Sequence, residues 1–517
     1  MKRLSPIMLA GTGSDVGKSM LATGLCRIFR QDGYNPAPFK AQNMALNSYA
    51  TPDGLEIGRA QAVQAEAACI PCSADMNPLL LKPTGERTSQ VVLNGRVIGN
   101  RDAYDYFRRE GRERLRDEVH SAFDRLSERY NPIVMEGAGS ISELNLRDSD
   151  LVNMPMARYA DAKVILVADI DRGGVFASIY GSVMLQDDED RNRICGVIVN
   201  KFRGDMRLFE SGCRMIEEIC GKPVLGVVPY MDDVHVEEED SVAICGKNHK
   251  VADAHNGQGA LVNVAVVLHR HISNFTDFNR LEHDNRVNLY YTNSPDEVRM
   301  ADIVILPGSK STLADLYDLR VSGMAKAVND VYVSGKTVLG ICGGYQMMGE
   351  YVSDPDGVEG DITMLPGLGL LPMRTVIGGE KVTRQVKFRF LDGDTDCSGY
   401  EIHMGMTVPA ADSESHSSGG SCLGKGRVLN RLADGSVDGY FVSQRCMGSY
   451  IHGILDNQEV IDFLLHPYVD SVVSVESSTT SQDYAAYKES QYDLLAERLR
   501  EYVDIPKLYR IMEGDND

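Results

Sequence analysis

The sequence of 517 residues has no apolar run that approaches the roughly 20 residues of a membrane-spanning helix. It also has no secretory signal, because the basic start Met1-Lys2-Arg3 leads into glycine-rich sequence rather than into an apolar core and a cleavage site. Both absences argue against an integral membrane protein or a secreted one. We therefore expect a cytoplasmic protein without a membrane partner.

Basic residues are scarce relative to acidic ones. The chain has 53 lysines and arginines against 74 aspartates and glutamates, a formal net charge of −21. A field of that sign repels phosphate backbones and anionic lipid, so we expect no nucleic-acid partner. The eleven cysteines are odd in number and scattered, which favours reduced thiols over a disulfide framework. For the lone C-x-x-C at Cys69 and Cys72, ordinary packing is favoured over zinc or redox use.

Short apolar runs rich in β-forming residues recur along the chain, with helical stretches between many of them. This alternation predicts an α/β protein of two domains, each with a mainly parallel sheet flanked by helices. A polar stretch over residues 232–258 separates the two series. We place the domains at residues 1–250 and 260–459, and a C-terminal helical extension at residues 460–517. The runs are Ile7–Ala10, Ile133–Met135, Lys163–Asp169, Gly196–Asn200, Val224–Val228, Val262–Leu268, Ile303–Leu306 and Thr337–Ile341.

A glycine-rich segment near the start has the context of a phosphate-binding loop. The segment Gly11–Ser19 follows an apolar strand and precedes a helical face over Met20–Phe29. Backbone N–H groups and a helix N-terminus attract phosphate oxygens, the lysine reaches the β- and γ-phosphates, and the last hydroxyl binds magnesium. The predicted nucleotide-binding residues are Thr12, Gly13, Asp15, Val16, Gly17, Lys18 and Ser19.

Two residues at the ends of other strands extend this site. Magnesium needs further oxygen ligands beside Ser19, and Glu136, at the end of its strand, is placed to supply one. Asp15 is a weaker candidate ligand. Asn200 ends another strand and is a candidate for reading the adenine ring, although a plain strand end explains it equally well.

A second motif, in the other half of the chain, has the form of a nucleophile elbow. The strand Thr337–Ile341 runs into G-x-C-x-G, whose small residues permit a sharp turn that exposes Cys342 at a helix N-terminus. The helix dipole there favours a thiolate. Gly343 supplies one oxyanion donor, and Gly308, in a loop after a strand, supplies a second. The best candidate base among the eleven histidines is His452.

Each motif resembles a known family. The loop has Thr12 where the strict pattern has glycine, a form that is similar to dethiobiotin synthetase and its relatives among P-loop NTPases. In the second half, the order of the Gly308 loop, the G-x-C-x-G elbow and the histidine resembles class I glutamine amidotransferases. The common triad of that class has a glutamate two residues after the histidine, where this chain has Ile454. Some branches, including the cobyrinate-amidating one, rely on Cys and His alone, and we do not favour Asp456 as a substitute.

The combination of both halves resembles the cobyric acid synthase family, the glutamine-dependent amidases of cobalamin biosynthesis. The match runs from residue 7 to about residue 457. The stretches that carry it are Lys40–Ser48, Glu56–Gln61, Glu136–Ser140, Glu143–Asp148, Asp171–Phe176, Ile272–Asp277 and Gly399–Gly405.

The resemblance implies a glutamine-hydrolysing carbon–nitrogen ligase that uses ATP and Mg²⁺. It implies that Cys342 and His452 release ammonia from glutamine, and that ATP activates corrin carboxylates as acyl phosphates. The implied substrate is adenosylcobyrinic acid a,c-diamide, amidated at the b, d, e and g positions. We expect ammonia to pass between the two active sites shielded from water. The protein is also a possible homo-oligomer.

Because that substrate is a polyanion and the protein is acidic, we expect local cations to line its site. Each candidate has an ordinary ion pair as an equally good explanation. The candidates are Lys40, Arg59, Lys82, Arg87, Arg147 and Arg172.

Two other functions compete with this interpretation. Cobyrinate a,c-diamide synthase has the same two-domain plan and chemistry but amidates other carboxylates. The Asn-Met-Ala-Leu-Asn-Ser stretch at residues 43–48 and the Glu-Leu-Asn-Leu-Arg-Asp stretch at residues 143–148 favour cobyric acid synthase. A P-loop regulatory ATPase with an inert glutaminase-like module is the other alternative, against which an intact Cys342 and His452 argue.

Overall fold

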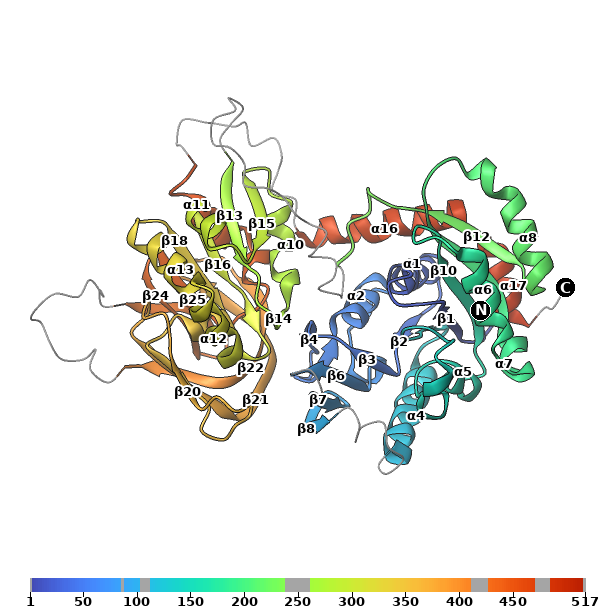
Figure 1. The fold of residues 1–517 in the computed structure, drawn as a ribbon, viewed down its shortest axis with the longest axis horizontal. Helices are drawn as coiled ribbons and strands as arrows, with labels where there is room; N and C mark the ends of the chain where they lie inside the picture. The colour runs from blue at the N-terminus through green and yellow to red at the C-terminus, as the bar shows by residue number, and fades with distance from the viewer. Residues whose placement is uncertain are drawn as a thin grey trace, which may run out of the picture. The chain divides into compact units, whose positions relative to one another are not determined.

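The computed structural model describes residues 2–84, 88–102, 112–237, 261–410, 426–469 and 484–514. The chain forms two compact units, which are described separately (Figure 1). The first comprises Met1–Ala45, Leu55–Glu237 and Ala485–Asp517, and the second comprises Leu46–Gly54 and Glu238–Tyr484. In the described ranges, no helix combines the length and apolar composition of a bilayer span.

This division differs from the contiguous ranges that we expected. The expected boundary near residue 250 falls outside the described residues. The short segment Leu46–Gly54 belongs to the second unit, and Ala485–Asp517 belongs to the first. Composition and hydrophobic periodicity report local structure, and neither indicates onto which core a segment folds back.

A six-stranded parallel sheet forms the centre of the first unit. Its strands are nearly continuous apolar runs because helices cover both faces of a parallel sheet. The central strand β1 (Ile7–Gly11) has β10 (Lys163–Asp169) on one side and β9 (Ile133–Glu136) on the other, so their carboxyl ends meet at one edge. The sheet continues through β11 (Ile194–Phe202) to β12 (Val224–Pro229) on one flank, and ends at β2 (Ala37–Phe39) on the other.

Helices and a smaller sheet complete this unit. The helix α1 (Lys18–Gln31) buries Leu21, Leu25, Ile28 and Phe29 in the same core as the central strands, as the helical spacing predicted. The further helices are α2 (Arg59–Ala67), α4 (Arg112–Arg129), α5 (Met154–Tyr159), α6 (Val175–Met184), α7 (Asp188–Arg193) and α8 (Glu210–Cys220). The smaller sheet joins β3 (Gln42–Met44), β6 (Leu79–Pro83), β7 (Thr88–Leu93) and β8 (Arg96–Asp102).

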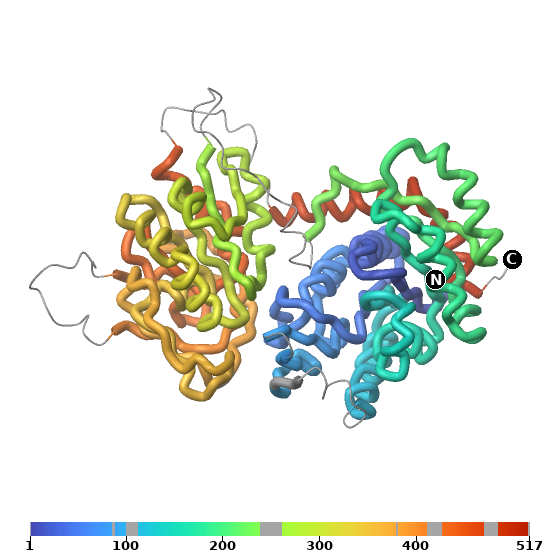
Figure 2. Tube along the Cα trace, in the orientation of Figure 1, coloured from blue at the N-terminus to red at the C-terminus, as the bar shows by residue number. Residues whose placement is uncertain are grey.

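The C-terminal helices pack on this first unit. In α16 (Tyr484–Tyr502), Leu495 and Leu499 are buried against α1, where a Cβ on Gly24 would lie 2.3 Å from Leu499 Cδ1. After α16, α17 (Ile505–Glu513) brings Met512 to the N-terminus, where its carbonyl accepts a 2.9 Å hydrogen bond from Ser5 N. The first and last described residues, 2 and 514, therefore both lie in the first unit (Figure 2). The described part of this tail is therefore helical over α16 and α17.

An eleven-stranded sheet forms the second unit. Its parallel part runs in the order β15 (Val287–Thr292), β13 (Val262–Val267), β16 (Ile303–Leu306), β18 (Thr337–Ile341) and β25 (Cys446–Ser449). The antiparallel part contains β24 (Val437–Ser443), β23 (Arg427–Leu432) and a long pair, β21 (Met373–Phe390) with β22 (Cys397–Pro409). At its edge β19 (Tyr351–Ser353) and β20 (Met364–Pro366) complete the sheet. The sequence predicted β13, β16 and β18 of the parallel part, but not β15, β25 or the antiparallel extension.

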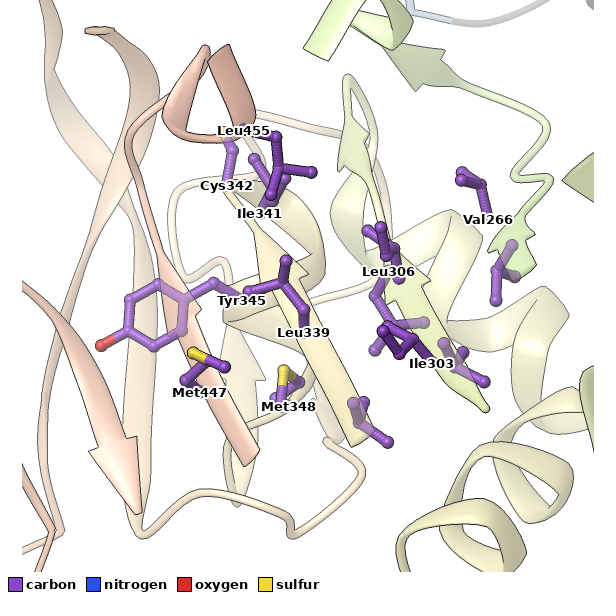
Figure 3. Close-up of a cluster of buried hydrophobic side chains, with 14 of the residues drawn as sticks. Val266, Ile303, Leu306, Leu339, Ile341, Cys342, Tyr345, Met348, Met447 and Leu455 are labelled. Carbon is purple, nitrogen blue, oxygen red and sulfur yellow. The ribbon is translucent and has the colours of Figure 1, made fainter. Parts of the chain in front are cut away.

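The helices of this unit are short, and the core lies between them and the sheet. They are α10 (Asn279–Glu282), α11 (Pro295–Met300), α12 (Thr312–Val321), α13 (Met324–Val333), α14 (Gly343–Met347) and α15 (Gln458–Leu465). Figure 3 shows Ile341 and Cys342 beside Leu455 at one end of this core, with Leu339, Met348 and Met447 further along the strands. Cys342 therefore lies at one end of the apolar core of this unit.

Candidate active sites

The glycine-rich loop connects β1 to α1 as the sequence predicted. Gly17 has φ +92°, and a Cβ there would lie 2.1 Å from Asn200 Nδ2, so only glycine fits. Lys18 is 6% exposed, and its Nζ donates hydrogen bonds to Gly13 O at 3.0 Å and Gly139 O at 3.1 Å. The ammonium is thus folded back onto the carbonyls of Gly13 and Gly139, beside the N-terminus of α1, where backbone N–H groups attract phosphate.

The residues that buttress this loop include two that we assigned to nucleotide binding. The Asn200 Nδ2 atom donates to Val16 O at 2.9 Å, and Thr12 N donates to Val167 O at 3.0 Å. The Asn200 amide is therefore directed at the loop backbone. Asp15, the weaker metal candidate, forms an ion pair of 3.1 Å with Arg172.

Glu136 lies at the centre of a buried polar cluster beside the loop. Its Oε1 accepts hydrogen bonds of 2.8 Å from Ser19 Oγ and from Lys40 Nζ, and its Oε2 accepts one of 2.8 Å from Gln64 Nε2. Burial favours the neutral acid, but the positive charge and hydrogen bond of Lys40 outweigh it and hold the pKa of Glu136 below its usual value. Lys18 acts in the same direction. The group is thus a carboxylate.

The donor set at this cluster fits magnesium delivered with a nucleotide. Mg²⁺ takes one or two protein oxygens and fills its other positions with phosphate oxygens and water. The Ser19 hydroxyl and the Glu136 carboxylate, 2.8 Å apart, offer those two oxygens. Across the described part of the chain, no group of three or more His, Cys, Asp or Glu side chains is arranged to hold a metal.

The described substrate-binding candidates all form ion pairs. Lys40 belongs to the Glu136 cluster, whereas Arg172 is exposed and lies beside Asp15. Arg87 lies outside the described residues. The other pairs are Arg59 with Glu237, Lys82 with Glu56, and Arg147 with Asp187 and Asp190. The first two of these pairs are buried, so their charges are already compensated inside the protein.

The elbow at Cys342 makes the sharp turn that the sequence predicted, but the side chain is buried, at 6% exposed, where the sequence predicted an exposed sulfur. Cys342 has φ 51° and ψ −110°, and its N–H donates to Ser449 O at 2.8 Å in the neighbouring strand. The next residues must be small, because a Cβ on Gly344 would lie 2.0 Å from Leu306 O and one on Gly343 would lie 2.8 Å from Ser309 N. The packing therefore presses the start of α14 against the end of β16 and holds the thiol at the sheet's carboxyl edge.

His452 is held by a carboxylate that the sequence did not single out. Its Nδ1 lies 2.7 Å from Asp277 Oδ2, and the other oxygen, Oδ1, accepts a 2.9 Å hydrogen bond from Gly453 N. Both side chains are almost completely buried. Asp277 thus orients the imidazole by a hydrogen bond. In the common triad a glutamate does this, but Ile454 occupies its place here and Asp456 was not favoured as a substitute. Asp277 ends a stretch that carried the family resemblance, and that was the available signal.

The charge state of His452 follows from its two partners. Burial lowers its pKa, but the charge of Asp277, the charge of Cys342 and the hydrogen bonds to both outweigh burial and raise the pKa to about 10. The nearby His403 shows the opposite case, because burial lowers its pKa to about 4. This difference makes His452 a cation beside the thiol and leaves His403 neutral.

The two predicted oxyanion donors lie on adjoining loops next to these groups. Gly343 is the first residue of α14, where a backbone N–H has no intrahelical partner. Gly308 begins β17 (Gly308–Ser309), which pairs with β14 (Ile272–Ser273), and a Cβ there would lie 3.1 Å from His452 Cε1. Glycine at 308 thus keeps space open beside the base. The arrangement brings nucleophile, base, acid and donor loops together.

Tyr400 is a second contact of the base that the sequence reasoning did not assign. Its ring stacks on His452 with a centroid distance of 5.3 Å and an interplanar angle of 25°. The two backbones also exchange hydrogen bonds, Tyr400 N to His452 O at 3.0 Å and His452 N to Tyr400 O at 2.8 Å. The base is therefore fixed at its ring face, at Nδ1 and at its backbone.

Comparisons with known proteins match both units. A CobQ/CobB/MinD/ParA nucleotide binding domain matches residues 7–242, and a CobB/CobQ-like glutamine amidotransferase domain matches residues 263–460. The cobyric acid synthase of Phocaeicola vulgatus is 65% identical over 516 residues, 100% of each chain. That of Parabacteroides distasonis is 53% identical, covering 99% of this chain and 100% of its own. A crystal structure of a glutamine amidotransferase is 18% identical with a TM-score of 0.29, covering 40% of this chain and 96% of its own.

Proposed function

Because this chain belongs to the cobyric acid synthase family, we propose that it amidates four carboxylates of adenosylcobyrinic acid a,c-diamide, at the b, d, e and g positions, with nitrogen from glutamine and energy from ATP. The single observation that carries the chemistry is the buried Cys342–His452–Asp277 arrangement in a chain that also has the Lys18 loop. The first supplies ammonia, and the second activates an acid.

In the second unit, the Cys342 thiolate attacks the side-chain carbonyl carbon of glutamine. Backbone N–H groups at Gly343 and Gly308 stabilise the oxyanion, and the His452 cation donates its proton to the departing nitrogen, so that ammonia leaves and a glutamyl thioester remains. Neutral His452 then takes a proton from water, which attacks the thioester and releases glutamate. Asp277 keeps Nδ1 protonated and the ring oriented throughout.

In the first unit, a carboxylate oxygen of the corrin attacks the γ-phosphorus of ATP, and ADP leaves. Lys18 neutralises charge on the phosphates, while Ser19 and Glu136 would hold the magnesium that the nucleotide brings. Ammonia attacks the acyl phosphate carbon, and phosphate leaves with formation of the amide. Each amide therefore consumes one ATP and one glutamine, and ammonia must travel shielded from water so that it stays unprotonated.

The reaction belongs in the cytoplasm, where its thiol nucleophile stays reduced. Cys342 is a free thiol, as the nucleophilic role requires. The exposed cation Arg172 and the half-buried Arg147 are the candidates for contact with the corrin polyanion. Arg59 and Lys82 are weaker candidates for contact with the corrin, because their charges are compensated by buried carboxylate partners.

The test is a reconstitution with ATP, glutamine and the a,c-diamide corrin, followed by a mass-spectrometric count of amides. Four additions per corrin are expected, and amidation at the a and c positions of a corrin without amides would instead indicate cobyrinate a,c-diamide synthase. The variant Cys342→Ala should lose glutamine-dependent amidation and keep activity on added ammonia, because only the nitrogen source is removed. Lys18→Ala should lose both. Glutamine-dependent amidation that survives Cys342→Ala would contradict the assignment.

A further inference from the structure

The segment Leu46–Gly54 belongs to the second unit although the sequence places it between elements of the first. It contains β4 (Ser48–Ala50), and Asn47, Ser48, Ala50 and Thr51 are all buried. Its attachment to the second unit includes a 3.0 Å hydrogen bond from Gln385 Nε2 to Ala50 O. The rest of this unit is the single range Glu238–Tyr484, so the segment joins it from a distant part of the chain.

One set of contacts leads from the segment to Asp277. Ser48 N donates a 2.9 Å hydrogen bond to Asn274 Oδ1, and Phe275 N donates one of 3.3 Å to Asn47 Oδ1. Asn274 has φ 54° and ψ 42°, a left-handed conformation that it holds at the start of a single 3₁₀ turn, η4 (Phe275–Phe278). That turn carries Asp277. The segment thus satisfies the polar groups at the start of the turn that presents the carboxylate to His452.

A second set of contacts leads to the other side of the same base. The Tyr49 ring lies edge-on to Tyr400, with centroids 4.6 Å apart and an interplanar angle of 61°. Ala50 shares a buried apolar cluster with Tyr400 and Ile402, against which Tyr49 packs. Tyr400 in turn stacks on His452 and exchanges backbone hydrogen bonds with it. Two independent paths from one short segment therefore end at one imidazole.

From these contacts we infer that Asn47 and Tyr49 are positioning residues for glutamine hydrolysis, which act through Asp277 and Tyr400 to fix the His452 ring. This inference rests on the proposed function of the second unit. The inference also connects glutamine hydrolysis to the synthetase along the chain, because both ends of the segment continue into the first unit, at Ala45 and Leu55. Lys40, on the carboxylate of Glu136, precedes Asn47 by a short stretch of backbone. The glutaminase is thereby built on a loop whose ends belong to the synthetase.

The test uses the full-length protein with Asn47→Ala and, separately, Tyr49→Ala. Each should lower kcat for glutamine hydrolysis by at least about tenfold with KM little changed, since a small misplacement of a catalytic group is costly whereas the glutamine contacts remain. Amidation from added ammonia should stay within about twofold of wild type. The alkaline limit of glutamine hydrolysis should move to lower pH, because a loosened Asp277 no longer sustains the cationic form of His452.

Two further variants separate positioning from folding. Tyr49→Phe keeps the ring on Tyr400 and should recover most of the activity that Tyr49→Ala loses; this pair carries the test if Asn47→Ala fails to fold. Asn329→Ala is the matched control, because this asparagine lies in α13 of the same unit and its amide donates a 3.4 Å hydrogen bond to Leu368 O rather than to the turn that carries Asp277.

Two outcomes would overturn the inference. One is unchanged kcat for glutamine hydrolysis in folded Asn47→Ala and Tyr49→Ala proteins. The other is a parallel loss of glutamine- and ammonia-dependent amidation, which would assign the segment to the synthetase. Neither outcome touches the proposed function, which fails instead when wild-type protein forms no amide from glutamine or when Cys342→Ala still does.

Discussion

Replacing Asp277 should lower glutamine hydrolysis in the second unit without changing the fold of that unit. Asp277→Asn keeps the size of the side chain but removes the charge that raises the pKa of His452. Glutamine hydrolysis should fall at least about 100-fold in kcat, as expected when the acid of a catalytic triad no longer fixes the tautomer of its base. Steady-state kinetics with glutamine measure this, and ammonia-dependent amidation serves as the internal control.

The same variant has a pH signature with a defined sign. In wild type, His452 has a pKa of about 10 and so remains a proton donor across the neutral range. Without the aspartate charge, only Cys342 opposes the effect of burial and the pKa of His452 falls, so the alkaline limit of glutamine hydrolysis should shift to lower pH. A profile with the wild-type alkaline limit would show that Asp277 does not govern the charge of this base.

At the scale of elements, the elbow between β18 and α14 depends on close backbone approach. A Cβ on Gly344 would lie 2.0 Å from Leu306 O, and this backbone oxygen cannot rotate away as a side chain could. Gly344→Ala should therefore push α14 from β16, lower the free energy of unfolding by about 1–3 kcal/mol and abolish glutamine-dependent amidation. Chemical denaturation and the glutaminase assay measure the two effects.

The matched control is Gly181→Ala in α6. Nothing lies within 4 Å of a Cβ at that position, and its backbone is helical. Alanine should stabilise this helix by about 0.5–1 kcal/mol, because glycine loses more backbone freedom on folding. If both substitutions gave the same change in unfolding free energy, steric contact at the elbow would not be the cause.

At the scale of the whole chain, the C-terminal helix is part of the nucleotide-binding unit. Leu499 is 1% exposed and fills the space over Gly24 in α1. Leu499→Ala should cost about 2–5 kcal/mol of unfolding free energy through the cavity it leaves, and it should impair amidation from ammonia as well as from glutamine. Denaturation followed by a probe in the first unit measures the cost.

The same substitution at an exposed leucine provides the comparison. Leu208 is 81% exposed, so Leu208→Ala removes the same atoms with little loss of burial and should leave stability within about 0.5 kcal/mol. Equal effects at positions 208 and 499 would contradict the packing of α16 on α1.

The sequence by itself determined the local structures with strong chemical constraints. The P-loop and the elbow were predictable because glycine, lysine and cysteine at fixed spacing leave few other conformations, as the φ of +92° at Gly17 and 51° at Cys342 show. The parallel strands were predictable because burial on both faces demands continuous apolar runs. The family followed from polar stretches that packing alone does not require.

Only the tertiary structure decided which distant residues meet. Asp277 lies far from His452 in the chain. It ends a stretch that carried the family resemblance, but only the 2.7 Å contact shows that this acid is the partner of the base. The packing partners of the segment Leu46–Gly54 and of Leu499 are likewise known only from the structure, because they depend on long-range packing. Periodicity reports which face of an element is buried, whereas its burial partner is set by the free energy of the whole fold.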